Sequence, residues 1–141
     1  MLCLEEETGM KTNSLRINQL SESAYERYLQ YLHALDSLDI EAYTKFLADD
    51  CEVQSNNNSP MKGKEAVMQG LGTYWQSFKE LEHDLLNIYG TDQNYVLEAI
   101  NNYTRLDGKK VSIRAVAFTD LNEDGLVKSV RFYTDTTPVF A

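Results

Sequence analysis

The chain has 141 residues, of which 43% are hydrophobic and 25% charged, and its formal net charge at pH 7 is −9. This length suits one domain with a single core, and the composition is that of an ordinary globular protein. The acidic balance repels phosphate backbones and anionic lipid surfaces, and no apolar run is long enough to cross a bilayer, so we expect neither nucleic acid nor a membrane as a partner.

The first residues carry no recognisable targeting signal. Residues 1–20 are polar and lack periodicity, so we predict a mobile N-terminal tail followed by a single domain over residues 21–141. The start has neither the basic nor the apolar region of a secretory signal. Cys3 and Cys51 form no CxxC motif, and the cysteines and histidines lie too far apart to give a metal-ligand spacing. These observations predict a cytoplasmic protein with reduced thiols, no metal and no cofactor.

Two helices are predicted in the first third of the chain. Ser23 followed by Glu26 has the spacing of a capping box at the start of the first helix. That helix carries a stripe of apolar and aromatic residues at helical spacing, namely Tyr25, Tyr28, Leu29, Leu32 and Leu35, with Tyr31 on its flank. Asp39 is placed to cap a second, shorter helix, which we expect to end near Asp49 and Asp50.

The middle of the chain alternates between strand and helix patterns. Residues 51–55 alternate like a short strand, and Gly63 opens a third helix that contains Gly70 and Gly72. Each of these two glycines weakens a helix by roughly 1 kcal/mol relative to Ala, which suggests that another group approaches the backbone closely there. Residues 81–89 have the pattern of another strand.

The last third of the chain predicts an antiparallel meander. Three stretches rich in β-branched and aromatic residues, 95–105, 110–121 and 126–134, are separated by turns that contain Asp-Gly pairs. Asp-Gly is typical of hairpin turns because Gly adopts positive φ without a Cβ clash. The order helix, helix, strand, helix and four strands predicts an α+β fold. A bent sheet around the leading helices would enclose a cone with one open end, the usual form of a small-molecule pocket.

Several segments resemble a known superfamily. The run 31–53, with LDIEAY at 38–43 and FLADDCEV at 46–53, and the run MKGKEA at 61–66 resemble ketosteroid isomerases. The run GLVKSVRFYTD at 125–135 resembles the closing strand of SnoaL-type polyketide cyclases. Both belong to the nuclear transport factor 2-like superfamily. The resemblance covers residues 23–140 and implies a cystatin-like α+β fold, in which a cone-shaped, curved antiparallel or mixed sheet wraps around N-terminal helices.

The resemblance also identifies the positions of the isomerase machinery, which uses an Asp base and an oxyanion hole made of a Tyr and a protonated Asp. Tyr31 falls where the oxyanion-hole Tyr lies. The base position falls on Ser55 and the protonated-Asp position on Ala117. Because a hydroxyl without an adjacent base cannot take a proton from carbon near neutral pH, this chain is not expected to be a standard ketosteroid isomerase.

His83 is the remaining candidate for proton transfer. It shares one face of its predicted strand with Leu85 and Asn87, because side chains alternate along a strand. A pocket-facing His of this kind resembles the dehydratase and SnoaL-like branches, and an imidazole suits acid–base chemistry near pH 7. The alternative is a His at a strand edge or one hydrogen-bonded in the core. Tyr31 could donate a hydrogen bond to a substrate oxygen, or be a core aromatic.

The strand over residues 95–105 has two possible phases. The preferred phase, by comparison with the isomerases, turns Glu98, Ile100, Asn102 and Thr104 inward, which would bring Glu98 and Asn102 into the cavity beside His83. The other phase turns Leu97, Ala99, Asn101 and Tyr103 inward. In the preferred phase Glu98 either forms an acid–base pair with His83 or lies solvated at the rim.

The sequence therefore predicts a pocket with His83 and Tyr31 as catalytic candidates. The other expected lining residues are Tyr28, Leu35, Ser55, Trp75, Phe78, Asn87, Glu98, Asn102, Ala117 and Phe132. Such a pocket would bind a small hydrophobic or polycyclic molecule, with cofactor-free isomerase, cyclase or dehydratase chemistry. The alternative is a non-catalytic binding or interaction module, especially if Trp75, Phe78, Phe118 and Phe132 fill the space. A homodimer is expected through the outer sheet face, where Arg114 and Arg131 could form salt bridges.

Overall fold

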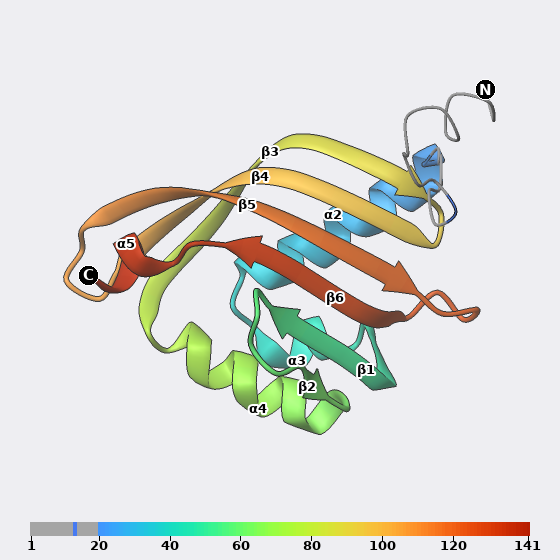
Figure 1. Cartoon of the computed structure of the whole chain (residues 1–141), viewed down its shortest axis with the longest axis horizontal. Coiled ribbons are helices and arrows are strands. Elements are labelled where there is room, and N and C mark those ends of the chain that lie inside the picture. The colour runs from blue at the N-terminus through green and yellow to red at the C-terminus, as the bar shows by residue number, and fades with distance from the viewer. Residues whose placement is uncertain (1–12, 14–19) are drawn as a thin grey trace.

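The computed structural model describes residue 13 and residues 20–141, so the predicted tail over residues 1–20 lies almost wholly outside the described residues. The predicted α+β order is confirmed (Figure 1). The elements are α2 (Glu22–Asp36), α3 (Ile40–Thr44), β1 (Leu47–Ser55), β2 (Met61–Lys62), α4 (Lys64–Trp75), β3 (Phe78–Thr91), β4 (Asn94–Arg105), β5 (Lys110–Leu121), β6 (Val127–Thr134) and α5 (Thr137–Phe140).

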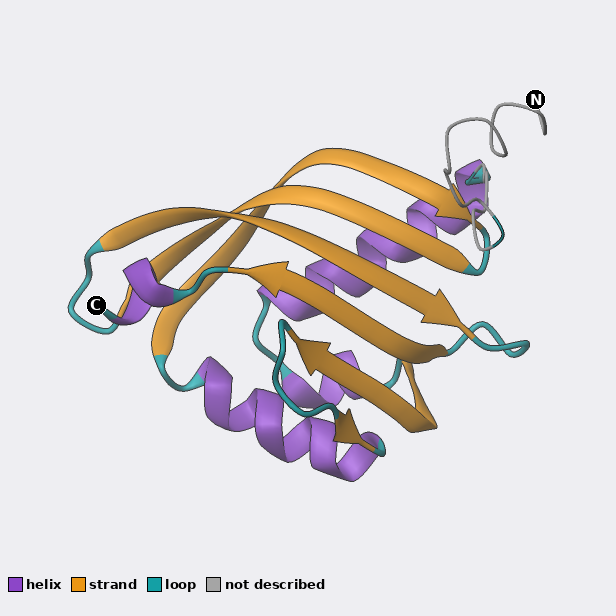
Figure 2. Cartoon of the chain, viewed as in Figure 1, coloured by secondary structure: helices purple, strands orange, loops and turns teal. Residues whose placement is uncertain are grey.

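One mixed sheet holds the six strands in the order β2-β1-β6-β5-β4-β3. The pairing is antiparallel throughout except between β1 and β6, which run parallel. The sheet arches over α2, with α3 and α4 on its lower side (Figure 2). Within residues 20–141 no helix is long and apolar enough to cross a membrane. The curved sheet and the helices beneath it are the arrangement that the sequence predicted.

Helix α2 begins two residues earlier than the predicted capping box. The N-cap is Ser21, whose Oγ accepts the backbone N–H of Ala24 at 3.2 Å, so the Ser23–Glu26 capping box was wrong. Asp92 holds this cap against the β3–β4 turn, because its carboxylate accepts the backbone N–H of Ser21 at 3.0 Å. The buried side of α2 consists of Ala24, Tyr28, Tyr31, Leu32 and Ala34.

Helix α3 begins as predicted but ends early. The Asp39 carboxylate accepts the backbone N–H groups of Glu41 and Ala42, both at 3.2 Å, which is an N-cap. The helix ends at Thr44 rather than near Asp49, because β1 begins at Leu47. Leu47 pairs with Val127 of β6, so long-range strand pairing overrides the local helical pattern here.

The predictions made for individual glycines can be checked position by position. Gly108 and Gly125 have φ of +87° and +78°, as the two Asp-Gly hairpin turns require. In α4, a Cβ on Gly70 would lie 2.2 Å from the Sδ of Met61, so the expected close approach at Gly70 is confirmed. A Cβ on Gly72 would meet nothing within 4 Å, so the same expectation was wrong there.

The two glycines of α4 give a matched pair of substitutions. Gly72→Ala should raise the free energy of unfolding by about 0.5–1 kcal/mol, because Ala favours a helix and the new Cβ enters open space. Gly70→Ala should give no gain or a loss, because the Met61 side chain must move. Urea denaturation of both variants measures the difference, and equal gains would contradict the contact between Gly70 and Met61.

Candidate functional site

A cavity lies between the concave face of the sheet and helices α2 and α4. Its volume is about 90 Å³, and aromatic and aliphatic side chains make up most of its wall. This is room for several water molecules or a small organic molecule. It is well below the roughly 300–1,000 Å³ of pockets that hold drug-sized ligands. The hollow therefore exists, but at this size it suits a small ring or short chain better than a polycyclic ligand.

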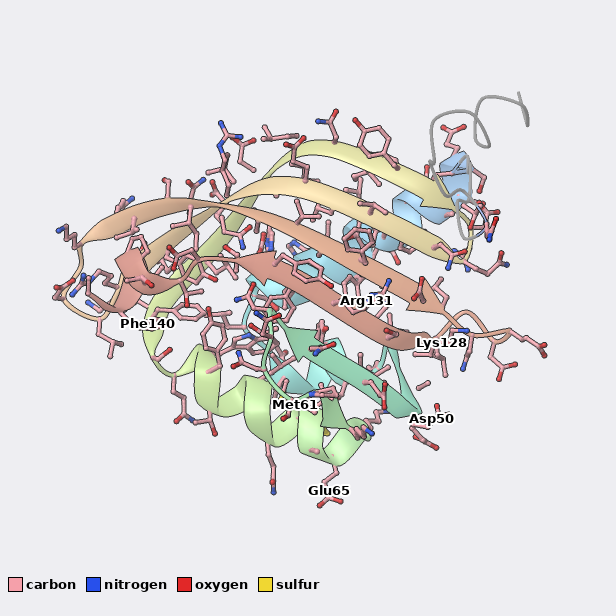
Figure 3. All side chains as sticks on the ribbon, viewed as in Figure 1. Asp50, Met61, Glu65, Lys128, Arg131 and Phe140 are labelled. Atoms are coloured by element: carbon pink, nitrogen blue, oxygen red, sulfur yellow. The ribbon has the colours of Figure 1, made fainter. Side chains whose placement is uncertain are left out.

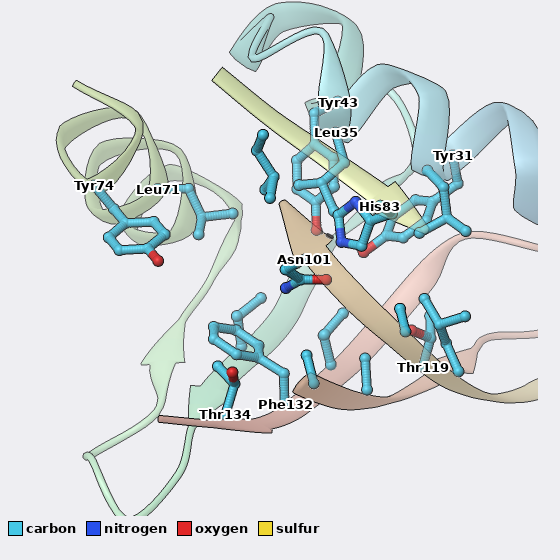
Figure 4. A pocket seen from close by; sticks show the side chains of 18 of the residues that line it. Tyr31, Leu35, Tyr43, Leu71, Tyr74, His83, Asn101, Thr119, Phe132 and Thr134 are labelled. Atoms are coloured by element: carbon cyan, nitrogen blue, oxygen red, sulfur yellow. Dashed lines mark hydrogen bonds between the residues drawn. The ribbon is translucent and has the colours of Figure 1, made fainter. Parts of the chain in front are cut away.

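His83 lies at the wall of this cavity (Figure 4). It is hydrogen-bonded to Asp36, the last residue of α2. One carboxylate oxygen of Asp36 is hydrogen-bonded to Nδ1 of His83, and the other accepts the backbone N–H of His83 at 3.1 Å. The His83 side chain is only 9% exposed. A carboxylate can only accept, so the ring proton lies on Nδ1 and Nε2 is the nitrogen left for a ligand.

Asn101 lies beside His83 on the neighbouring strand. The two residues are directly opposed in the β3–β4 register, so their side chains share the concave face. Asn101 is 7% exposed, and its Oδ1 has no hydrogen-bond partner among the residues that the structure describes. Figure 4 shows the amide reaching into the cavity below His83, between Tyr74 and Tyr31. Buried carbonyl oxygens are rarely left unpaired, so this atom marks a place where the cavity lacks a donor.

Two pairs of tyrosine hydroxyls add polar groups to the wall. The hydroxyl oxygens of Tyr31 and Tyr43 are 2.6 Å apart, and those of Tyr74 and Tyr103 are 3.0 Å apart. Burial raises the pKa of Tyr43 to about 12 and raises the pKa of Tyr31 well above its ordinary value, so both hydroxyls stay protonated near neutral pH. Because one hydroxyl of a pair donates to the other, each pair keeps one proton to donate to a ligand.

Tyr28 separates this cavity from a second hollow of about 160 Å³, which opens beside Arg27 and Gly125. Tyr28 is 1% exposed, and its hydroxyl has no hydrogen-bond partner in the described part of the chain. Burial raises its pKa, and the nearby Thr119 hydroxyl partly opposes that rise without lying in hydrogen-bonding geometry.

Seven of the predicted site residues line the cavity: Tyr28, Tyr31, Leu35, Trp75, His83, Ala117 and Phe132. Phe118 and Phe78 do not line the cavity. The Phe78 ring packs against two residues of the wall, Tyr74 and Tyr103, with ring centroids 5.3 and 4.9 Å away. The expected aromatic cluster therefore does not fill the space. The catalytic roles given to His83 and Tyr31 stay predictions.

Five predicted lining residues lie outside the cavity wall: Ser55, Phe78, Asn87, Glu98 and Asn102. The preferred phase of β4 was wrong, because the buried residues of this strand are Tyr95, Leu97, Ala99, Asn101 and Tyr103. Glu98 and Asn102 therefore point to the outer face, where Asn102 accepts a hydrogen bond from Ser112 at 2.7 Å. Ser55 ends β1 beside the turn that begins at Asn56 and does not reach the hollow.

Asn87 was misplaced for a different reason. The β3–β4 register shifts between Leu85 and Asn87, so Leu86 is an extra residue in β3. Beyond this bulge the inward and outward positions exchange, and Asn87 leaves the face of His83. Its amide donates to Glu98 at 2.5 Å on the outer face. The apolar positions of β3 change phase across the bulge, from Leu81 and Leu85 before it to Ile88 beyond it.

The sequence reasoning missed several polar residues of the site, among them Asp36, Tyr43 and Tyr74. Asp36 follows Tyr28 and Leu32 at four-residue spacing, and an acidic residue on that buried stripe was the available signal. Tyr43 and Tyr74 carry no signal that distinguishes them from ordinary core aromatic residues. Asn101 belonged to the phase that was not preferred. Among the described residues, no three His, Cys, Asp or Glu side chains cluster as a metal site would require.

Comparisons with known proteins agree with this architecture. Residues 28–130 match the sequence profile of the SnoaL-like domain family. A nuclear transport factor 2-like protein of unknown function from Burkholderia pseudomallei superposes with a TM-score of 0.74 and 12% identity, over 86% of this chain and 100% of that chain. The comparison with curated proteins gave no match.

Two similar structures are enzymes by their descriptions. An epoxide hydrolase/cyclase-like enzyme of pyran ring formation in polyether salinomycin has a TM-score of 0.71 and 14% identity, over 82% of this chain and 93% of that chain. An epoxide hydrolase of the LEH-like type from M. tuberculosis has a TM-score of 0.68 and 18% identity, over 83% and 86%. At such identities these similarities establish the fold alone.

The hydroxyl groups of the cavity allow a matched test of the geometry. Tyr43→Phe should lower the free energy of unfolding by about 1–3 kcal/mol, because it leaves the Tyr31 hydroxyl buried without its partner. Tyr28→Phe should leave the free energy of unfolding unchanged or higher, because the hydroxyl that it removes makes no hydrogen bond to any residue that the structure describes. Both values come from urea denaturation, and similar losses in the two variants would contradict these assignments.

Proposed function

Because the chain belongs to the SnoaL-like domain family, we propose that its cavity binds a small, neutral, largely apolar molecule and that His83 moves a proton to or from it. The observation that carries this proposal is the hydrogen bond between Asp36 and Nδ1 of His83 at the wall of the cavity. The reaction class is cofactor-free isomerisation, cyclisation or dehydration.

The contact with Asp36 gives His83 a defined chemical role. With its proton on Nδ1, the neutral imidazole presents a basic lone pair at Nε2. When Nε2 takes a proton from a substrate C–H or O–H, the imidazolium that forms is stabilised by the Asp36 carboxylate. The same nitrogen can then return the proton to another substrate atom. Asp36 is a positioning residue in this scheme, because its oxygens bind His83.

The tyrosine pair supplies the complementary group. Removing a proton from a carbon next to a carbonyl places negative charge on the carbonyl oxygen. Tyr31 and Tyr43, both buried, together retain one hydroxyl proton for such an oxygen. Tyr31 is therefore proposed as hydrogen-bond donor and His83 as acid–base group, both as the sequence suggested.

Ligand size follows from the volume of the hollow. A space of about 90 Å³ favours a small ring or short chain, and a polycyclic molecule would require side chains to move. Apart from His83 and the tyrosines, the wall that the described residues form has no ionisable side chain, which favours a neutral ligand.

The α-proton exchange of small ketones in D₂O tests the proton transfer without knowledge of the substrate. Wild-type protein should accelerate exchange into cyclohexanone or a similar ketone, followed by NMR. His83→Gln should reduce that acceleration by about 100-fold or more, because it removes the base. His33→Gln is the control, because His33 is exposed on α2 and outside the cavity wall.

Asp36→Asn should reduce exchange as strongly. The amide oxygen would keep the hydrogen bond from the backbone N–H of His83, so the NH₂ group would face Nδ1. The ring proton would then lie on Nε2. Nitrogen NMR of the ring reports this change of tautomer. If wild type gave no acceleration while ligands still bound, the protein would be a binding module without catalysis. If wild type accelerated exchange and His83→Gln were as fast, His83 would not be the base.

We also propose that the chain forms a homodimer through the outer face of the sheet. Phe118 and Tyr133 lie there with ring centroids 6.0 Å apart, and Tyr133 is 48% exposed. Arg131 lies 5.5 Å from the centre of the Phe118 ring and donates to Asp120 at 2.8 Å, the outer-face salt bridge expected for this Arg. Exposed aromatic residues with a neighbouring Arg are typical anchors of an interface.

Tyr133→Glu should raise the dimer dissociation constant at least about tenfold, because it places a charge at the centre of this patch. Sedimentation equilibrium measures the constant. Tyr25→Glu is the matched control, because Tyr25 is similarly exposed but lies on α2. A wild-type protein that sediments as a monomer would overturn the dimer.

A further inference from the structure

We propose that the ligand of the cavity is a small hydroxy-carbonyl compound whose hydroxyl donates to Oδ1 of Asn101, which makes Asn101 the residue that determines specificity. This inference rests on the proposed function and names the ligand class for the same site. A hydrocarbon or a simple ketone would leave the Asn101 oxygen unpaired.

The orientation of the Asn101 amide decides which group it offers to a ligand. Tyr103 lies two residues further along the same strand face, and its hydroxyl oxygen is 3.0 Å from that of Tyr74. Burial raises the pKa of Tyr103, and the Tyr74 and Asn101 side chains partly oppose that rise. Oδ1 of Asn101 has no hydrogen-bond partner among the described residues, so this carbonyl oxygen is left to accept from a ligand.

The position of Asn101 relates the ligand hydroxyl to the reacting atom. His83 and Asn101 are directly opposed across β3 and β4, and such pairs have Cβ atoms about 4.5–5.5 Å apart. Nε2 of His83 and Oδ1 of Asn101 therefore act on neighbouring parts of one small molecule. The tyrosine pair of Tyr31 and Tyr43 retains a proton for an acceptor. A ligand that satisfies all three carries one acceptor, one hydroxyl donor and a transferable proton near both.

Other ligand classes fit these groups less well. A carboxylate would place an anion against the Asn101 carbonyl, with the Asp36 carboxylate close behind His83. A cation would find no carboxylate in the wall that the described residues form. A neutral molecule with a hydroxyl beside its carbonyl gives a partner to Asn101, to His83 and to the tyrosine pair.

Cyclohexanone and its α-hydroxy derivative test the inference, because they differ by one hydroxyl. Their dissociation constants come from NMR titration of cavity side chains in the full-length protein. Wild type should bind the hydroxyketone about tenfold more tightly or better. Asn101→Leu, nearly equal in size, should bring the ratio to about one while cyclohexanone binding is kept. Asn102→Leu, on the outer face of the same strand, should leave the ratio as in wild type.

Each outcome bears on a different claim. Equal binding of the two compounds by wild type, or a preference that survives Asn101→Leu, overturns the role of Asn101 and leaves the proposed function standing. If neither compound shifts the cavity signals, the proposed function and this inference both fail. Should Asn101→Leu not fold, which circular dichroism would reveal, Asn101→Ala carries the same expectation.

Discussion

Two hydrogen bonds between Asp36 and His83 join the helix α2 to the sheet. Strand β3 is an edge of the sheet, and Asp36 is the last residue of the helix that crosses beneath that edge. The carboxylate of Asp36 accepts one hydrogen bond from the backbone N–H of His83 and one from its ring, so a single side chain holds α2 and β3 together. The same contact holds the imidazole at the wall of the hollow between the sheet and α2.

Aromatic packing explains why the hollow remains small and polar in places. The buried side of α2 presents Tyr28 and Tyr31, whose rings pack against Tyr95 and Tyr43 with centroids 4.5 and 5.2 Å apart. Tyrosine fills volume as Phe does but brings a hydroxyl that needs a partner when buried. Here the hydroxyls of Tyr31 and Tyr43 are hydrogen-bonded to each other, whereas that of Tyr28 has no partner among residues 20–141. Figure 3 shows the side chains of the described residues on the ribbon, including those that lie between the sheet and α4.

The sequence predicted what depends on local rules and failed where long-range pairing decides. Gly108 and Gly125 predicted the hairpins correctly, because the turns at these positions require positive φ. The phase of β4 could not be chosen locally, because Glu98 and Asn101 are polar residues on opposite faces and neither face is purely apolar. The bulge at Leu86 likewise arises from pairing with β4. His83 was identified as an inward residue, but its partner Asp36 lies 47 residues away in sequence and only the folded chain brings them together.

The polar residues of the cavity do not occupy the positions that correspond to the isomerase base and protonated Asp. Ser55 and Ala117 provide no acid or base, and Ser55 does not reach the cavity. The polar groups that do reach it, His83 and Asn101, lie on the adjacent strands β3 and β4, opposite the tyrosines of the helices. The concave face of the sheet offers many inward positions, because every second residue of each strand faces the same space. Polar side chains of the cavity wall can therefore lie on strands other than those of Ser55 and Ala117, while Tyr31 of α2 remains in the wall. For His83, the end of a helix supports the inward position, because Asp36 is the last residue of α2.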